Sequence, residues 1–228
     1  MTMRRPALSI AARLFLTGWV VYALHFATDI VREHYPAVSL DERGTLRVDP
    51  YGGLHPDLFE IPGRGACRNT KPGAAVVGAI PYALTRPMLE PVVERAAARR
   101  RTGPTPEYDD PRPMRRAFFA RAYEQGLDVR FGLAAGVIQA LAVAPLSAAM
   151  LVVMFGLLQR LGFSRRQATA LSLVYGFATP LFFRTAFLNH NLLVAHATLG
   201  SFALLTRRDG IETRGPRLAL AGLVLGAG

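Results

Sequence analysis

The sequence predicts an all-α fold, that of a polytopic membrane protein with a long extracytoplasmic first loop that contains an interfacial helix. The first observation is that no charged side chain occurs between Arg130 and Arg160. A helix needs only about 20 apolar residues to cross about 30 Å of hydrocarbon. The second is a mean hydropathy of +0.23, reached although residues 31–130 are largely polar. A long uncharged run and a positive mean hydropathy are together typical of membrane proteins and rare in soluble domains.

Several segments of the chain are apolar enough to be predicted as membrane spans. The first has an apolar run like that of a signal peptide but no small-residue cleavage site, so we expect it to be retained as a helix. The run that starts at residue 218 is too short to span, and we therefore expect an N-terminal fragment of a longer protein. The expected spans are residues 10–30, 131–159, 167–187 and 190–206, with a fifth begun at 218.

Basic residues in short loops predict the orientation of the spans. Arginines gather before the first span, in the tight loop 160–166 and in the loop 207–217. Placing these on the cytoplasmic side puts the long first loop on the outer side. The expected organisation is a cytoplasmic N-terminus and first span (1–30), the extracytoplasmic loop (31–130), spans two to four (131–206), a cytoplasmic loop (207–217) and the start of a fifth span (218–228).

The long loop contains an apolar stretch that can be interpreted in two ways. A spanning helix at 74–93 would bring the arginine-rich residues 95–121 inside, but it would place the two short basic loops outside. This stretch also contains three prolines and two charges, which are unfavourable in lipid. We therefore expect an interfacial helix over about 74–97, followed by a proline-rich linker at 102–113.

Composition limits the possible partners and the location. The net charge is +11, yet Lys71 is the only lysine among 27 basic residues, and alanine, glycine and proline are abundant. This usage is typical of a GC-rich bacterial genome, so we expect a bacterial plasma membrane protein. The arginines are scattered and match no nucleic-acid motif, so nucleic acid is not an expected partner. Cys67 is the only cysteine, which excludes an intrachain disulfide and a cysteine-based metal site.

Two carboxylates follow the first predicted span. Asp29 and Glu33 are four residues apart and would share one face of a helix. They could couple electrostatically or share a divalent ion. The alternative is a solvated helix end with Arg32 and Arg43 as neighbours.

Further candidate residues lie later in the long loop. His55 and Asp57 occur in a turn-rich segment, where the acid and the imidazole could also be incidental. Lys71 precedes Pro-Gly and the apolar helix, where a compact ammonium could hold a lipid-linked phosphate. Chance placement of the single lysine is the competing explanation.

The outer turn near residue 187 is the third polar region. Arg184 either extends to lipid head groups or binds an anion. Asn189 and His190 concentrate hydrogen-bonding groups at the expected membrane surface, with a plain short turn as the alternative.

Three stretches resemble a known family. They are Thr28-Asp-Ile-Val-Arg-Glu-His-Tyr35, Asn69-Thr-Lys-Pro-Gly73 with the helix that follows it, and Leu173-Val-Tyr-Gly-Phe-Ala-Thr-Pro-Leu-Phe-Phe-Arg184 continued by Asn189-His190. Together they resemble the multi-pass membrane glycosyltransferases that use polyprenyl-phosphate sugars. This is the GT-C superfamily, which includes the protein mannosyltransferases and the lipid A aminoarabinose transferases.

The resemblance implies an inverting transfer of a sugar from a polyprenyl-phosphate donor to a lipid or glycan acceptor on the extracytoplasmic face. Asp29 would be the general base. Lys71, with Arg184, would neutralise the leaving lipid phosphate. Asn189 and His190 would contribute to binding of the substrate.

The resemblance leaves metal dependence open. Some relatives bind a divalent metal, and Glu33, or His55 with Asp57, would then be candidates for holding the metal or the substrate. No metal ligand is assigned from the sequence.

A second functional class remains open from the residues. A non-catalytic polytopic membrane protein that binds or transports a lipid-linked or anionic solute would keep Lys71 and Arg184 as anion contacts. It would have no need of Asp29 as a base.

Overall fold

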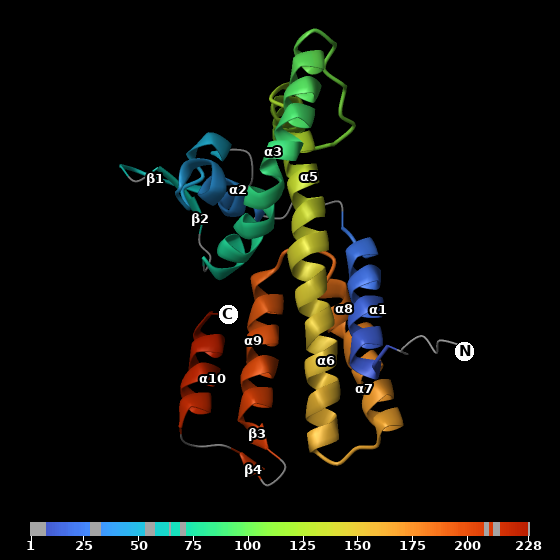
Figure 1. The fold of residues 1–228 in the computed structure, drawn as a ribbon. Helices are drawn as coiled ribbons and strands as arrows, with labels where there is room; N and C mark the ends of the chain where they lie inside the picture. Colours follow the sequence, from blue (N-terminus) through green and yellow to red (C-terminus); the bar gives the residue numbers. More distant parts are fainter. Residues whose placement is uncertain are drawn as a thin grey trace, which may run out of the picture. The chain divides into compact units, whose positions relative to one another are not determined.

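The computed structural model is mostly helical, as the all-α prediction expects (Figure 1). The strands in its described part form two short two-stranded sheets, and all else that is regular is helix. The structure describes residues 8–27, 33–52, 58–63, 65–68, 72–207, 210–211 and 215–227.

The chain divides into two compact units, which we call the bundle unit (1–27 and 139–228) and the loop unit (28–138). In the bundle unit, α1, α7 and α9 pack against α6, and α10 packs against α9. Its elements are α1 (Ile10–Leu24), the π-helix η2 (Gln139–Val143), α6 (Ala144–Arg160), α7 (Arg165–Phe177), α8 (Pro180–Arg184), α9 (His190–Leu205), β3 (Thr206–Arg207), β4 (Gly210–Ile211) and α10 (Pro216–Ala227).

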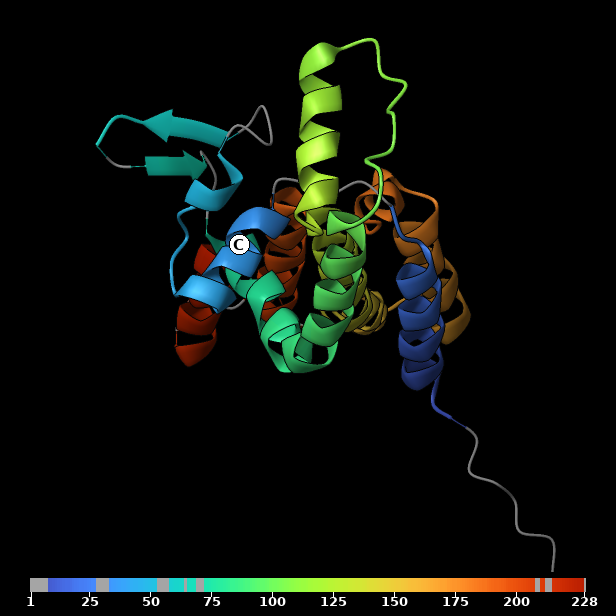
Figure 2. The same cartoon turned by 90° about the horizontal axis from the view of Figure 1, so that it is seen from above.

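The loop unit is helical with one antiparallel hairpin, which projects at its edge beside α2 (Figure 2). In it, α3 packs on α2 and on α5. The helix expected near 74–97 is α3, which stays continuous through three prolines, and residues 103–112 have no helix or strand. The elements are α2 (His34–Arg43), η1 (Asp49–Tyr51), β1 (Leu58–Ile61), β2 (Gly65–Arg68), α3 (Gly73–Arg101), α4 (Pro113–Glu124) and α5 (Leu127–Ile138).

One helix in the described part of the chain is long and apolar enough to cross a membrane. It runs over 34 residues, Leu127–Arg160, and combines α5, η2 and α6. The expected spans near 10–30 and 190–206 correspond to α1 and α9, which have 15 and 16 residues. These are shorter than the about 20 residues that a perpendicular span requires. Helix length therefore supports one span.

The expected span at 167–187 is not one continuous helix. The α7 helix ends at Phe177 and α8 starts at Pro180. The residue before a proline is driven out of the α conformation, and Thr179 is accordingly extended, with φ −119° and ψ 166°. Its hydroxyl accepts a hydrogen bond from the Leu181 N–H at 3.2 Å, which makes it the N-cap of α8.

The π-turn in the long helix has an identifiable cause. Pro145 has no N–H and cannot complete the backbone ladder of this turn. The carbonyl oxygen of Ala140 accepts a hydrogen bond from the indole nitrogen of Trp19 at 2.8 Å instead. A proline deep in an apolar helix is tolerated because a neighbouring helix supplies the missing donor.

The Gln139 amide joins three segments of the bundle unit. Its Nε2 donates to the carbonyl oxygens of Tyr22 at 2.7 Å, Thr185 at 2.6 Å and His25 at 3.3 Å. The side chain is buried. The end of α1 and the residue after α8 are therefore tied to the π-turn by one amide group.

Small residues let the helices approach α6 closely. A Cβ placed on Gly18 of α1 would lie 2.7 Å from Leu151, and one on Gly176 of α7 would also meet Leu151. The Tyr22 hydroxyl donates to the Gly176 carbonyl oxygen at 3.1 Å. Close packing through glycine with a few interhelical hydrogen bonds is the usual way in which helices associate in an apolar medium.

Replacing Gln139 tests this tie. Gln139→Met keeps the length of the side chain but leaves three carbonyl oxygens without their donor, and we expect the bundle unit to lose about 2 kcal/mol. Thermal unfolding in detergent, followed by the fluorescence of the single tryptophan Trp19, measures this loss. Gln159→Met, near the end of the same helix, is the matched control. Equal unfolding midpoints for the two variants would contradict the role of Gln139.

Candidate functional site

Four of the residues selected from the sequence lie outside the described residues. They are Asp29, His55, Asp57 and Lys71. The expected base, the expected phosphate-binding lysine and one candidate metal pair therefore stay predictions.

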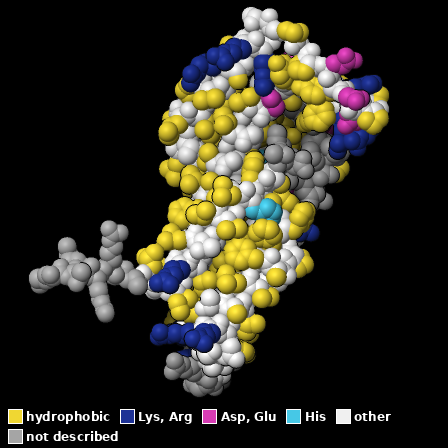
Figure 3. All heavy atoms as spheres, turned by 90° about the vertical axis from the view of Figure 1, so that its right-hand side faces the viewer, with side chains coloured by type: hydrophobic (Ala, Val, Ile, Leu, Met, Phe, Trp, Pro, Cys, Tyr) yellow, Lys and Arg dark blue, Asp and Glu magenta, His cyan; other side chains and the backbone are white. Residues whose placement is uncertain are grey.

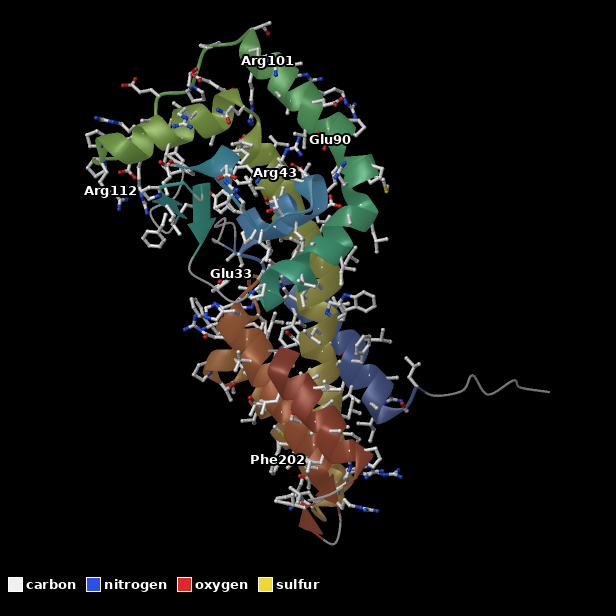
Figure 4. The ribbon with its side chains drawn as sticks, turned by 90° about the vertical axis from the view of Figure 1, so that its left-hand side faces the viewer. Glu33, Arg43, Glu90, Arg101, Arg112 and Phe202 are labelled. Atoms are coloured by element: carbon white, nitrogen blue, oxygen red, sulfur yellow. The ribbon has the colours of Figure 1, made fainter. Side chains whose placement is uncertain are left out.

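Glu33 lies among the described residues, and its burial bears on the expectation of a solvated helix end. It occupies the N-cap position of α2 and its exposed fraction is 3% (Figure 4). The adjacent His34 is 1% exposed, and both side chains interact with other groups of the protein. The expected solvated helix end is therefore wrong for Glu33, which lies inside the loop unit.

The bundle unit contains the other three selected residues. Arg184 is exposed at the last position of α8. Asn189 is the N-cap of α9, and its Oδ1 accepts a hydrogen bond from the Asn191 N–H at 2.8 Å. His190 begins α9 and has a partner within the protein. Part of the hydrogen-bonding capacity expected to bind substrate is thus used to start a helix.

The turn that carries Arg184 is held by the end of α1. The Ala27 N–H donates to the Ala186 carbonyl oxygen at 2.9 Å. The ring of His25 stacks on Phe182 with centroids 4.0 Å apart. These contacts place the residues that follow α1 next to the α8 turn within the bundle unit.

The loop unit holds an ionic cluster that the sequence did not predict. Arg130 from α5 binds Glu42 from α2, and its Nη2 donates to Glu90 of α3 at 2.7 Å (Glu90 is labelled in Figure 4). The Tyr82 hydroxyl donates to the same Glu42 carboxylate at 2.7 Å. We call these four residues the Arg130 cluster. It connects the three main helices of the unit.

The surroundings of Tyr82 keep its hydroxyl protonated, so that it always acts as a hydrogen-bond donor in this cluster. Burial raises the pKa of the Tyr82 phenol, and the hydrogen bond to the Glu42 carboxylate raises it further. The phenol therefore stays protonated and satisfies one carboxylate oxygen. A bidentate guanidinium and a phenol together compensate two carboxylates that are only partly open to water.

Another ion pair explains the remaining charge on the apolar part of α3. Arg86 donates to Asp41 of α2 at 2.9 Å. The sequence identified Arg86 and Glu90 as unsuited to a lipid-exposed span, and the structure gives both a partner inside the loop unit. The partners themselves, Asp41 and Arg130, had no signal in the local sequence, because they lie 45 and 40 positions away along the chain.

An aromatic cluster adjoins these charges. Tyr35, Tyr51 and Phe131 pack with ring centroids 4.7 to 5.4 Å apart, and the guanidinium of Arg43 lies 5.9 Å from the Tyr51 ring. Burial raises the pKa of both tyrosines to about 12. Their hydroxyls remain protonated at neutral pH and can act only as neutral hydrogen-bonding groups.

The hairpin is anchored by one carboxylate. Asp49 accepts a hydrogen bond from the Ala66 N–H at 2.6 Å and another from Arg47 at 3.0 Å. These bonds hold the pKa of Asp49 below its usual value. Within the described ranges, no group of three or more histidine, cysteine, aspartate and glutamate residues is arranged to hold a metal ion.

Comparison of the chain with models of protein families, with curated proteins and with solved structures finds no match.

Removing Arg130 tests how far the loop unit depends on its cluster. Arg130→Gln leaves Glu42 and Glu90 facing each other without their shared cation. Because the arginine side chain is 19% exposed, we expect a loss of about 2 kcal/mol, less than a fully buried pair would cost. Hydrogen–deuterium exchange of α3 measures the lowered free energy of opening.

The matched control for this measurement is Arg112→Gln. Arg112 pairs with Asp110 but is 60% exposed, so its loss should change exchange very little. Unchanged protection of α3 in Arg130→Gln would show that the cluster does not hold the unit together.

Proposed function

We propose that this protein is an integral membrane glycosyltransferase of the GT-C type. It would move a sugar from a polyprenyl-phosphate donor to a lipid or glycan acceptor on the extracytoplasmic face. The observation that supports this most strongly is an exposed apolar ridge on α3, which begins directly after the Asn-Thr-Lys-Pro-Gly stretch at 69–73.

The ridge consists of large apolar side chains at every fourth position of α3, where neighbours lie one above the other. Their exposed fractions run from 41% to 77%. A solvent-facing helix would carry polar residues at these positions. The ridge residues are Val76, Ile80, Leu84, Met88 and Val92.

The side of α3 opposite the ridge packs against other helices of the loop unit. Ala75, Ala79 and Tyr82 are buried, and Arg86 and Glu90 pair with residues of α2 and α5. The ridge is therefore free to contact an apolar medium or an apolar partner. A helix with one face bound to a polar domain and the other apolar suits the membrane interface.

The bundle unit supports the membrane part of the proposal. Hydrophobic side chains predominate on its visible face, and basic ones gather toward its lower end (Figure 3). Exposed aliphatic residues on α1 and α7 include Leu16, Val20, Leu24 and Val174. Together with the helix Leu127–Arg160, this surface suits contact with lipid.

The start of α3 suits an anionic group. The helix begins at Gly73 without a side-chain cap and without an acidic residue in its first turn. The N–H groups and dipole of such an end favour a phosphate. Lys71, two residues earlier, would add a full positive charge next to it.

In the proposed reaction, Asp29 takes the proton from an acceptor hydroxyl. The oxygen of that hydroxyl attacks the anomeric carbon of the sugar. The bond between that carbon and the phosphate oxygen breaks, and the electron pair leaves with the lipid phosphate. Lys71 would stabilise the charge that develops there.

Substitution of the two leading residues tests this reaction. In membranes from cells that express the protein, Asp29→Asn and Lys71→Ala should each reduce sugar transfer by about 100-fold or more. Transfer is measured with a panel of radiolabelled polyprenyl-phosphate sugars. Asp109→Asn, an exposed carboxylate of the proline-rich linker, should leave it unchanged.

The alternative function gives a different result in the same membranes. A protein that only binds or transports a lipid-linked anion would retain polyprenyl phosphate in wild type and in Asp29→Asn, and it would turn over no donor. That combination would overturn the catalytic proposal while keeping the membrane assignment.

The position of the α3 ridge can be measured directly. In a Cys67→Ser background, a nitroxide label at Leu84 should collide with dissolved oxygen, which concentrates in lipid. A label at the exposed Arg95 of the same helix should collide with a water-soluble nickel complex. Power-saturation spectroscopy in liposomes distinguishes the two environments. Protection of Leu84 from both reagents would indicate a protein partner on the ridge instead.

A further inference from the structure

We propose that the groove between α6, α9 and α10 binds an anionic phospholipid, with the lipid phosphate at the arginine end and an acyl chain along the helices. This inference depends on the membrane location of the bundle unit and is independent of the sugar-transfer reaction. The residues that line the groove all belong to the bundle unit.

The groove is large and mostly apolar along its length. Its volume is about 1000 Å³. Its walls come from aliphatic residues and glycines on three helices, and none of the described lining residues is acidic. The apolar lining includes Val152, Val153, Gly156, Gly200, Leu204 and Val224.

Three arginines gather at one end of the groove. Arg160 ends α6, Arg207 follows α9 and Arg217 lies in the first turn of α10. The Nη1 of Arg160 donates to the carbonyl oxygens of Ala203 at 2.5 Å and Thr206 at 3.2 Å. These bonds fix the guanidinium at the end of α9, and its Nε and Nη2 make no hydrogen bond to the described residues.

The distance from the charged end into the apolar part matches an amphiphile. Val152 precedes Arg160 by eight residues, which corresponds to about 12 Å of helix. Val224 follows Arg217 by seven residues on α10. A ligand that reaches the arginines and fills the groove therefore needs a negative head and an apolar chain of more than about 10 Å.

Two glycines keep the groove open. A Cβ on Gly156 would meet no atom within 4 Å, and one on Gly200 would lie 3.7 Å from Val224. Larger residues at Gly156 would therefore occupy the groove without displacing the protein. This gives a substitution that blocks the site and still allows folding.

Charge and shape favour an anionic phospholipid over free phosphate. Inorganic phosphate would contact only the arginines and leave the apolar walls in water. The arginine end belongs to the loop 207–217 and the end of α6, which the sequence predicts to face the cytoplasm, where anionic lipids attract basic clusters. Guanidinium groups also match phosphate oxygens in bidentate geometry.

Native mass spectrometry of the purified chain in an uncharged detergent tests the proposal. Dioleoyl phosphatidylglycerol should bind about tenfold more tightly than dioleoyl phosphatidylcholine. Arg217→Gln should weaken phosphatidylglycerol binding about fivefold by removing one headgroup contact. Gly156→Leu should abolish it by filling the groove.

Each variant has a matched control. Arg165→Gln removes an exposed arginine of α7 that does not line the groove, and Gly222→Leu enlarges an α10 glycine with open space around it. Both should bind as wild type does. Phosphatidylglycerol binding that survives Gly156→Leu would overturn the proposal, as would full competition by inorganic phosphate.

The outcome can be separated from that of the proposed enzyme activity. Loss of lipid binding in Gly156→Leu is measured without a sugar donor. If the protein binds phosphatidylglycerol but transfers no sugar, the lipid-binding proposal stands and the proposed enzyme activity is overturned. If it transfers sugar but does not bind the anionic lipid selectively, the enzyme activity stands and the lipid-binding proposal is overturned.

Discussion

The helix Leu127–Arg160 is the element on which the packing of both units depends. In the loop unit its first part holds α2 and α3, and in the bundle unit its later part holds α1, α7 and α9. Both of its flanking arginines have partners. Arg130 pairs with two carboxylates, whereas Arg160 donates to the terminal carbonyls of α9 and keeps its positive charge.

Inside the bundle unit, a few buried polar groups connect the helices. Gln139, Trp19 and Tyr22 each donate to a backbone carbonyl of another segment, and Ser147 lies 3.0 Å from the imidazole of His196. Apolar burial is non-directional and can hold helices together without defining their register. Such hydrogen bonds define it, because each requires one rotation and one height of its helix.

In the loop unit, α3 separates two environments. The side that faces α2 and α5 contains its paired charges and small residues, while the ridge from Val76 to Val92 remains exposed. The same helix thus anchors a polar unit and offers an apolar surface. This division supports the interfacial location in the proposed function, and it explains how charged residues occur within an apolar stretch.

The helical class, the uncharged run, the position of α3 and the proline-rich linker could be predicted from the sequence, because these features depend on neighbouring residues. The break at Thr179-Pro180 also has a local cause that the sequence contains. Three features could be seen only in the folded protein: Glu33 is buried, Arg130 pairs with Glu42 and Glu90, and a groove remains beside α9. Burial and pairing depend on which helices meet, and local hydropathy carries no information about partners 40 to 88 residues away.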